Sequence, residues 1–143
     1  MNIRKAMQGD AEAITDLLKQ LDYALPVTAV REKIERFSHV ENELLMVYVE
    51  DDRPLAFISI HFIPQIAVEG DFARISYFCV DEDHREKKIG DGIERYCVES
   101  ATARGCDRIE LHSHSRRTDA HRFYEQHGYS ESPKYYVKYL NGK

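Results

Sequence analysis

The stretch from Phe72 to His112 constrains the fold of this chain more than any other part of its sequence. An apolar run over Phe72–Val80 is followed by the strongly charged loop Asp81–Lys87, a helical pattern over Lys88–Ala103 and a second β-type run at Asp107–His112. A strand–helix–strand order of this length predicts a βαβ unit, because parallel strands need a long crossover connection. We therefore expect two parallel strands with a right-handed crossover.

The flanking segments also switch between helical and β-type patterns. Ile14, Leu17, Leu18 and Leu21 recur at helical spacing, and Asp10 stands where an N-cap is expected. The other expected elements are strands at Asn2–Ala6, Leu44–Glu50 and Leu55–Ile63, helices at Ala11–Leu21, from Thr28 to about Phe37 and from Thr118 or Asp119 to Gly128, and late strands at Tyr129 and Tyr135–Leu140. This order predicts a mixed α/β layer domain.

Length, charge and hydropathy narrow the class of protein. The 143 residues are the size of one domain, so residues 1–143 are expected to form a single domain. The formal net charge of −5 argues against nucleic acid as a partner, because phosphate binding needs a basic face. No apolar run reaches the length of a membrane span and the first residues lack a secretory signal core, so we expect a soluble cytoplasmic protein with no membrane partner.

The cysteines and histidines do not predict a metal site. Cys79, Cys97 and Cys106 are an odd number without CxxC spacing, and we expect three reduced thiols that behave as small hydrophobic residues. His112 and His114 lie two apart on or just after a strand, but a metal site needs three or four matched ligands. No metal is therefore expected.

The charged loop and the helix that follows it carry the first chemical signal. A helix N-terminus has N–H groups without a partner inside the helix and a partial positive charge, so it can hold phosphate groups. Arg85, Lys87 and Lys88 add positive charge at this end, and Gly90 and Gly92 allow a ligand to approach the backbone. Taken alone, the pattern fits a solvated loop before a closely packed helix at least as well.

A second segment supports a functional interpretation of the charged loop. The stretch Ala120-x-x-Phe123-Tyr124, with Gly128-Tyr129 shortly after, follows the loop in which Arg85 and Gly90 occupy the ends of an Arg-x-x-x-x-Gly pattern. Together the two segments resemble the motifs of the GNAT acetyltransferase superfamily, whose first motif reads Gln/Arg-x-x-Gly-x-Gly/Ala. The resemblance covers nearly the whole chain, and Arg116–Tyr124 looks most like small acetyltransferases related to aminoalkylphosphonate N-acetyltransferase.

The resemblance implies a fold, a co-substrate and a set of site residues. The implied fold is a GNAT-like domain with a central mixed, mostly antiparallel sheet flanked by helices and one parallel βαβ unit. Acetyl-CoA and an amine acceptor are the implied partners, with direct attack and no acyl-enzyme. Tyr124 is implied as the acid that protonates the leaving thiolate. The implied acetyl-CoA-binding residues are Phe78, Cys79, Val80, Arg85, Glu86, Lys87, Lys88, Ile89, Gly90 and Asp91.

Two departures from the motif leave alternatives open. Lys88 replaces the first motif glycine, and no carboxylate stands near Ser76 or Tyr77, where many members carry their base. A binding module that keeps the CoA site without chemistry is therefore the second hypothesis. The candidate bases are His61, Glu69, Asp71, Tyr77, His112, His114 or ordered water. The acceptor stays open, as does the choice between a monomer and a homodimer.

Overall fold

The computed structural model describes residues 2–112, 118–132 and 135–141, without the side chains of Glu86, Lys87 and Thr118. The chain divides into two compact units, Met1–His112 and Ser113–Lys143. The first unit contains β1 (Ile3–Lys5), η1 (Gln8–Asp10), α1 (Ala11–Gln20), α2 (Val27–Ser38), β2 (Glu43–Glu50), β3 (Arg53–Ile63), β4 (Phe72–Val80), η2 (Glu82–Lys87), α3 (Ile89–Ala103) and β5 (Arg108–Leu111). The second contains α4 (Thr118–Gln126). The prediction of one domain over 1–143 stays a prediction.

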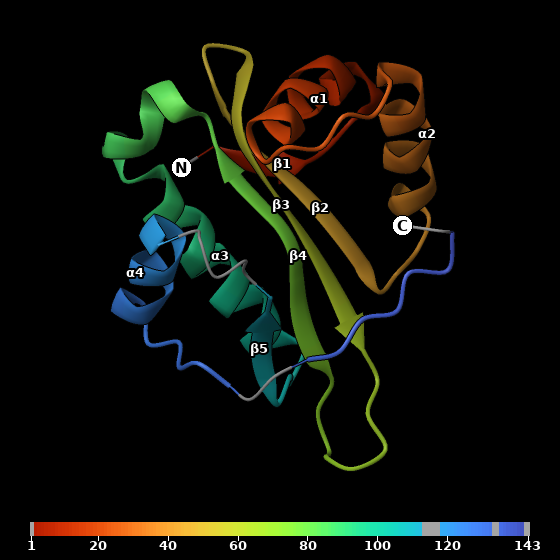
Figure 1. Cartoon of the computed structure of the whole chain (residues 1–143), viewed down its shortest axis with the longest axis vertical. Coiled ribbons are helices and arrows are strands. Elements are labelled where there is room, and N and C mark those ends of the chain that lie inside the picture. Colours follow the sequence, from red (N-terminus) through yellow and green to blue (C-terminus); the bar gives the residue numbers. More distant parts are fainter. Residues whose placement is uncertain (1, 113–117, 133–134, 142–143) are drawn as a thin grey trace. The chain divides into compact units, whose positions relative to one another are not determined.

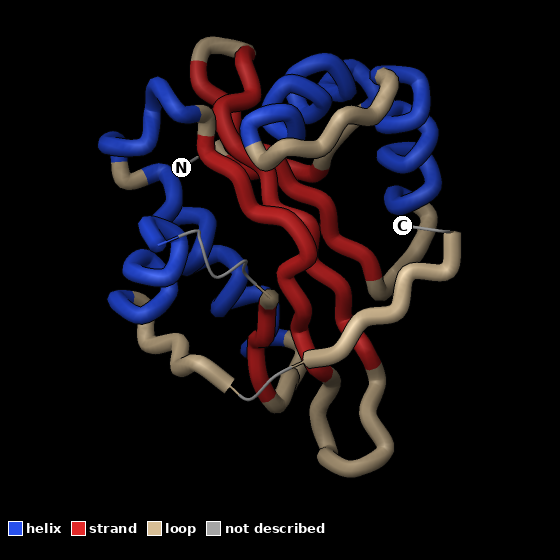
Figure 2. Tube along the Cα trace, in the orientation of Figure 1, coloured by secondary structure: helices blue, strands red, loops and turns tan. Residues whose placement is uncertain are grey.

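The five strands of the first unit form one mixed sheet in the order β1-β2-β3-β4-β5. The first three pairings are antiparallel, and β4 pairs with β5 in parallel across the α3 crossover (Figure 1). The strands run through the centre of this unit with helices beside them (Figure 2). This arrangement confirms the predicted mixed, mostly antiparallel sheet with one parallel βαβ unit.

Two apolar cores hold α3 on one face of the sheet and α1 and α2 on the other. Ile89, Ile93 and Cys97 of α3 pack against Ile58 and Ile60 of β3. Alternate β3 residues point the other way, as strand geometry requires, and Phe57 joins the core beneath α1 and α2. Burial raises the pKa of the Cys97 thiol to about 12, so this cysteine stays protonated inside the core.

Several sequence predictions need correction. The second helix begins at Val27 with Pro26 at its N-cap, so Thr28 does not cap it. Asp10 occupies the N-cap position of α1, but its carboxylate makes no cap hydrogen bond there and instead accepts from Arg4 and from the Met7 N–H. The late strands are wrong for the residues described, because Tyr129 and residues 135–141 have no strand structure.

In the second unit, the Gly128-Tyr129 part of the sequence motif ends helix α4. Gly128 has a φ of 88°, the left-handed conformation common after a helix C-terminus. The N–H of Gly128 donates to the Glu125 carbonyl (3.1 Å) and the N–H of Tyr129 to the Tyr124 carbonyl (3.0 Å), the hydrogen bonds of a Schellman cap. The rings of Tyr124 and Tyr129 then pack edge-on, 5.5 Å apart.

Candidate active site

The pairing between β4 and β5 ends halfway along β4. Among the described residues, β5 pairs with β4 from Phe72 to Ile75, while β4 continues beside β3 to Val80. The register against β3 shifts at the same point, because Ile75 pairs with Ile60 whereas Tyr77 pairs with Ser59. Ser76 is thus an extra residue, a β-bulge, and bulges bend a strand and disrupt its ladder.

The bulge determines what the second half of β4 presents. The Asp81 N–H donates to the Leu55 carbonyl of β3 (2.8 Å), and backbone groups alternate in direction along a strand. The N–H and C=O groups of Phe78 and Val80 therefore point toward the β5 side. A hydrogen bond from Arg85 Nε to the Val80 carbonyl (3.3 Å) agrees with this direction.

Cys79 has the opposite orientation. Its alternating position turns its backbone toward β3. Its buried thiol belongs to the core beneath α1 and α2 and donates to the Leu17 carbonyl (3.4 Å). The structure therefore brings Phe78 and Val80, but not the Cys79 backbone, to the edge where β5 has ended.

The expected phosphate-binding loop leads directly from this edge into α3. Arg85 and Lys88 are exposed, and Gly90 and Asp91 are half-buried in the first turn of the helix. Ile89 is fully buried in the core under α3, so only its backbone can face a ligand. The side chains of Glu86 and Lys87 lie outside the described part of the loop.

Lys88 adopts a backbone conformation that glycine usually occupies. Its φ is 59° and its ψ is 22°, in the left-handed region. A residue with a Cβ pays about 1–2 kcal/mol in this conformation. The loop therefore keeps the backbone path suited to glycine and accepts strain at the lysine, whose exposed ammonium lies at the start of α3.

Gln20, the last residue of α1, holds the beginning of the loop. Its side-chain Nε2 donates to Asp81 Oδ1 (2.9 Å), and its Oε1 accepts from the Glu82 N–H (3.0 Å). His84 Nδ1 lies 2.6 Å from the other oxygen of Asp81. The hydrogen bond from Gln20, followed by that from His84, holds the pKa of the Asp81 carboxyl below its ordinary value despite partial burial. The loop is thus fixed to α1 before it reaches α3.

Tyr124, the expected acid, belongs to the second unit. It is half-buried on α4, and its ring contacts Phe123 and Tyr129 edge-on. His114, one of the candidate bases, lies outside the described residues.

The other candidate bases lie at different distances from Phe78. A strand advances about 3.3 Å per residue, which puts Asp71 roughly 20 Å away. Glu69 lies in the loop before β4. His61 pairs with Arg74, four residues from Phe78 and thus roughly 13 Å away. His112 follows Leu111, which pairs with Ile75 beside the bulge. His112 and Tyr77 are therefore the candidates nearest to the second half of β4.

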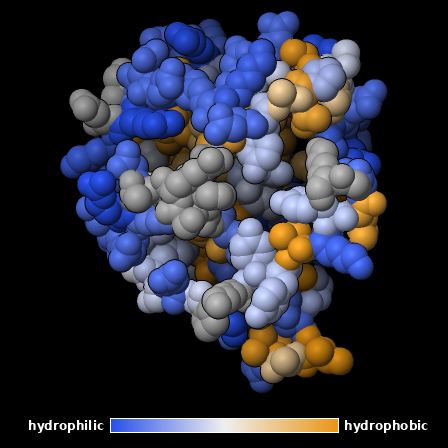
Figure 3. Space-filling model, in the orientation of Figure 1, coloured by the Kyte–Doolittle hydropathy of each residue, from blue (hydrophilic) through white to orange (hydrophobic). Residues whose placement is uncertain are grey.

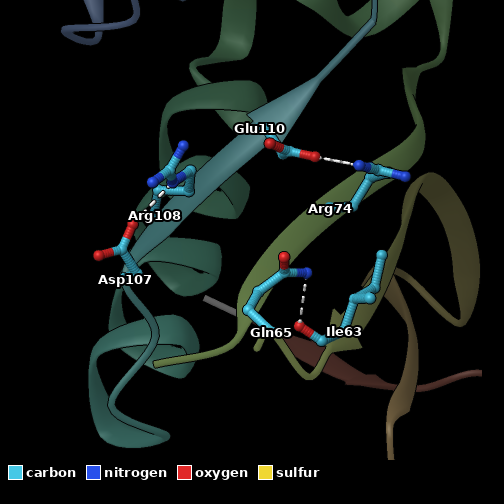
Figure 4. A network of polar contacts seen from close by, with 6 residues as sticks. All are labelled: Ile63, Gln65, Arg74, Asp107, Arg108 and Glu110. Atoms are coloured by element: carbon cyan, nitrogen blue, oxygen red, sulfur yellow. Dashed lines mark hydrogen bonds and ion pairs between the residues drawn. The ribbon is translucent and has the colours of Figure 1, made fainter. Parts of the chain in front are cut away.

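A row of ionisable residues crosses the sheet before the bulge, where β4 still pairs with β5. The strand register aligns Glu43, His61, Arg74 and Glu110 across β2, β3, β4 and β5. His61 contacts Glu43, and Arg74 Nε donates to Glu110 Oε1 (2.9 Å), a contact drawn in Figure 4. Since both ends of the row are paired, it acts as a structural tie that the sequence patterns did not reveal.

Tyr77 is held in an aromatic contact at the bulge. Its ring meets that of Tyr23 edge-on, with the centroids 5.2 Å apart. Burial, and then the neighbouring Tyr23, raise the pKa of the Tyr77 phenol above its ordinary value. The phenol therefore keeps its proton at neutral pH and is a poor base there.

Comparison with known proteins assigns the family of this chain. The sequence profile of the acetyltransferase (GNAT) family matches residues 11–129. This protein belongs to the GNAT acetyltransferase family. Family membership supports acetyl transfer as its general activity and acetyl-CoA as the co-substrate.

Solved structures share the fold over almost the whole chain. A transcriptional regulator from Bacillus halodurans C-125 is 25% identical, with a TM-score of 0.88 and coverage of 97% of this chain and 99% of that chain. A putative acetyltransferase from Agrobacterium tumefaciens is 19% identical, with a TM-score of 0.87 and coverage of 98% and 100%. Glucosamine-6-phosphate N-acetyltransferase from Arabidopsis thaliana is 21% identical, with a TM-score of 0.82 and coverage of 98% of each chain. A search of curated proteins gave no significant match.

Two further observations concern the described residues alone. None of their helices combines the length and the apolar character needed to cross a bilayer. The described part of the chain also contains no group of three or more His, Cys, Asp or Glu side chains placed to hold a metal ion.

Proposed function

We propose that this protein is an acetyl-CoA-dependent N-acetyltransferase that acts on a primary amine through a ternary complex. The observation that carries the proposal is the second half of β4, which extends past its pairing with β5 and leads into the α3 loop. An acyl-pantetheine arm is a chain of amides that can pair with such a backbone edge. Residues 1–143 would act as one catalytic domain.

The proposed binding mode uses the two ends of this segment. The N–H groups that start α3, with Arg85 and Lys88 beside them, suit the pyrophosphate of acetyl-CoA. The backbone of Phe78 and Val80 suits the pantetheine amides and the acetyl carbonyl. An N–H that faces the carbonyl oxygen would stabilise the oxyanion of the tetrahedral intermediate, which is a large contribution to acyl transfer.

The proposed chemistry needs one base and one acid. An alkyl amine has a pKa of about 10.4, so its nitrogen must lose a proton before it attacks the thioester carbon. We propose that His112 accepts this proton from the amine, directly or through water, because histidine exchanges protons near neutral pH. Collapse of the intermediate breaks the C–S bond, and Tyr124 gives its proton to the thiolate. The products are the N-acetyl amine and CoA.

Acetyl-CoA binding and turnover test the proposal separately. A ligand at one hundred times its dissociation constant stabilises the folded state by about 2.7 kcal/mol, so a thermal-shift titration should respond to acetyl-CoA. Thiol release should then follow when amines are added. A thermal shift without turnover on any amine would support the inactive CoA-binding module, and the absence of both would overturn acetyl-CoA as the ligand.

Tyr124→Phe tests the acid within the same assay. The variant keeps the ring that packs on Tyr129 and removes the hydroxyl. We expect kcat to fall about 100-fold, at the lower end for general acid catalysis, with acetyl-CoA affinity unchanged. Full kcat with rate-limiting chemistry would make Tyr124 a packing residue.

A further inference from the structure

The loop that joins α1 to α2 places the ring of Tyr23 against Tyr77 at the bulge of β4. Tyr23 is 45% exposed and Tyr77 is 38% exposed, and Leu25, two residues after Tyr23, is 40% exposed. Figure 3 shows that much of the visible surface is hydrophilic. Large apolar side chains that gather on a surface commonly mark a binding site.

The position of Tyr23 is built into the end of α1. The Tyr23 N–H donates to the Leu18 carbonyl (2.9 Å) and the Asp22 N–H to the Lys19 carbonyl (3.0 Å), which form a Schellman cap. Asp22 has a φ of 69° at the position where glycine is usual. Gln20, three residues before Tyr23, is tied to Asp81 and Glu82. Backbone hydrogen bonds therefore fix the position of Tyr23 at the end of α1.

The two tyrosines lie on a different face of the sheet from α3. Ile75, before the bulge, packs in the core under α3. Beyond the bulge, Cys79 enters the core under α1 and α2, and Tyr77 shares that face because side chains alternate along a strand. A co-substrate held by the α3 loop and an acceptor held by Tyr23 and Tyr77 would approach β4 from opposite faces. This arrangement permits direct transfer between them.

Exposed carboxylates lie next to Tyr23 in the sequence, on α1 and at the start of the α3 loop. Asp22 is exposed between Gln20 and Tyr23, and Asp16 is exposed on α1. Glu82, which is tied to Gln20 through its N–H, is exposed as well. Lys19 lies 3.9 Å from Asp16, and the exposed Arg85 bonds the Val80 carbonyl of β4. Aromatic faces beside carboxylates favour a cation, through cation–π attraction and through charge.

We propose that Tyr23 and Tyr77 form the acceptor subsite and that they bind a second positive charge on the acceptor. The inference rests on the proposed acetyl transfer. The reacting nitrogen must be neutral to attack, so the cation that the tyrosines hold is another group of the same molecule. The acceptor class is therefore a diamine or another amine that carries a separate cationic centre.

Three amines of equal chain length test this subsite. They are 1,5-diaminopentane, n-pentylamine and 5-aminopentanoate, which end in a cation, a methyl group and an anion. We expect kcat/KM to be highest for the diamine and lowest for the amino acid, with about a 3- to 30-fold preference for the diamine over pentylamine. The assay measures thiol release at saturating acetyl-CoA.

Substitutions at the two tyrosines assign the preference to them. Tyr23→Leu and Tyr77→Leu should remove the diamine preference while the KM for acetyl-CoA stays the same. Tyr23→Phe and Tyr77→Phe keep the rings and should keep the preference, and they serve as matched controls. Thermal unfolding checks that each variant is folded. If one leucine variant unfolds, the other leucine variant and the wild-type amine series still decide the question.

The outcomes separate this inference from the proposed function. Transfer without a diamine preference, or a preference that survives both leucine substitutions, overturns the subsite. A thermal response to acetyl-CoA with no turnover of any of the three amines overturns it as well. The absence of both acetyl-CoA binding and turnover instead overturns the proposed function on which the inference rests.

Discussion

Lys88 is the residue whose backbone conformation conflicts most with its side chain. Lysine at a φ of 59° costs about 1–2 kcal/mol, and a glycine there costs about 0.5–1 kcal/mol through the greater freedom of the unfolded chain. We expect Lys88→Gly to raise the free energy of unfolding by about 0.5–1 kcal/mol. We also expect it to change acetyl-CoA affinity by less than about tenfold.

Chemical denaturation and isothermal titration measure the two effects of Lys88→Gly. Lys88→Ala is the matched control, because it removes the charge and keeps the Cβ that causes the strain. Equal stability gains in both variants would show that charge, not backbone conformation, limits this position.

His112 is the second residue with a clear test. If it accepts the proton of the attacking amine, His112→Gln should lower kcat/KM at neutral pH about 100-fold or more and leave acetyl-CoA affinity intact. His61→Gln is the control, because His61 is half-buried against Glu43 and lies opposite Arg74, away from the second half of β4. Steady-state rates at several pH values decide the matter. A larger loss of kcat/KM in the His61 variant would indicate that His61, and not His112, is the base.

At the scale of the elements, α1 and the α3 loop are connected through Gln20. Gln20→Leu removes the donor to Asp81 and the acceptor of the Glu82 N–H while it keeps a similar volume. Loss of hydrogen bonds to a charged group costs about 1.5–3 kcal/mol. We expect the KM for acetyl-CoA to rise about tenfold or more and kcat to change little, because the loop would need to be ordered on binding.

Gln8→Leu provides the comparison for Gln20. Gln8 also bonds a carboxylate, that of Glu35, but lies on the exposed surface of η1 and α2. An equal rise in the KM for acetyl-CoA in both variants would show that the contact between Gln20 and the α3 loop is not the cause.

The sequence predicted the elements better than their ends and better than the site geometry. Apolar periodicity was sufficient for the helices and for the strands up to β5, because buried faces repeat at regular intervals. It failed for Tyr135–Leu140, where the residues favour strands but strand structure needs a neighbouring strand. The bulge at Ser76 could not be read from one strand, since a register shift exists only between two strands.

The motif residues also divide into features that the sequence predicted and features that only the structure shows. Arg85 and Gly90 were recognisable as a loop before a helix, but the left-handed backbone at Lys88 was not, because lysine normally avoids it. Gln20 gave no signal either, since its partners Asp81 and Glu82 are about sixty residues away in the sequence. Contacts between distant segments are where the structure adds most to the sequence.

At the scale of the whole molecule, acid should unfold the protein partly through Asp10. Burial raises the pKa of this carboxyl, but hydrogen bonds from Arg4 and the Met7 N–H outweigh burial and hold the pKa below its ordinary value. A lowered folded-state pKa stabilises the protein above the unfolded value of about 3.9, and this stability is lost as the pH falls further.

Asp10→Asn tests this contribution to acid stability. We expect the variant to lose about 2 kcal/mol at pH 7 and to approach the wild type at pH 2 to 3. Urea unfolding across this pH range is the measurement. A constant difference between the two proteins would mean that the ionised form of Asp10 has no special role.

The extra residue in β4 has a consequence for how this fold tolerates changes in length. Ile75 and Tyr77 would still face opposite sides of the sheet if Ser76 were deleted, because they already pair with adjacent residues of β3. Both cores would keep their contacts, and the strand would become regular enough for β5 to continue beside it. Deletion of Ser76 should therefore give a protein that melts no earlier than the wild type and no longer responds to acetyl-CoA. One residue would then separate folding from activity, and a lineage could convert this enzyme into an inert scaffold in a single step.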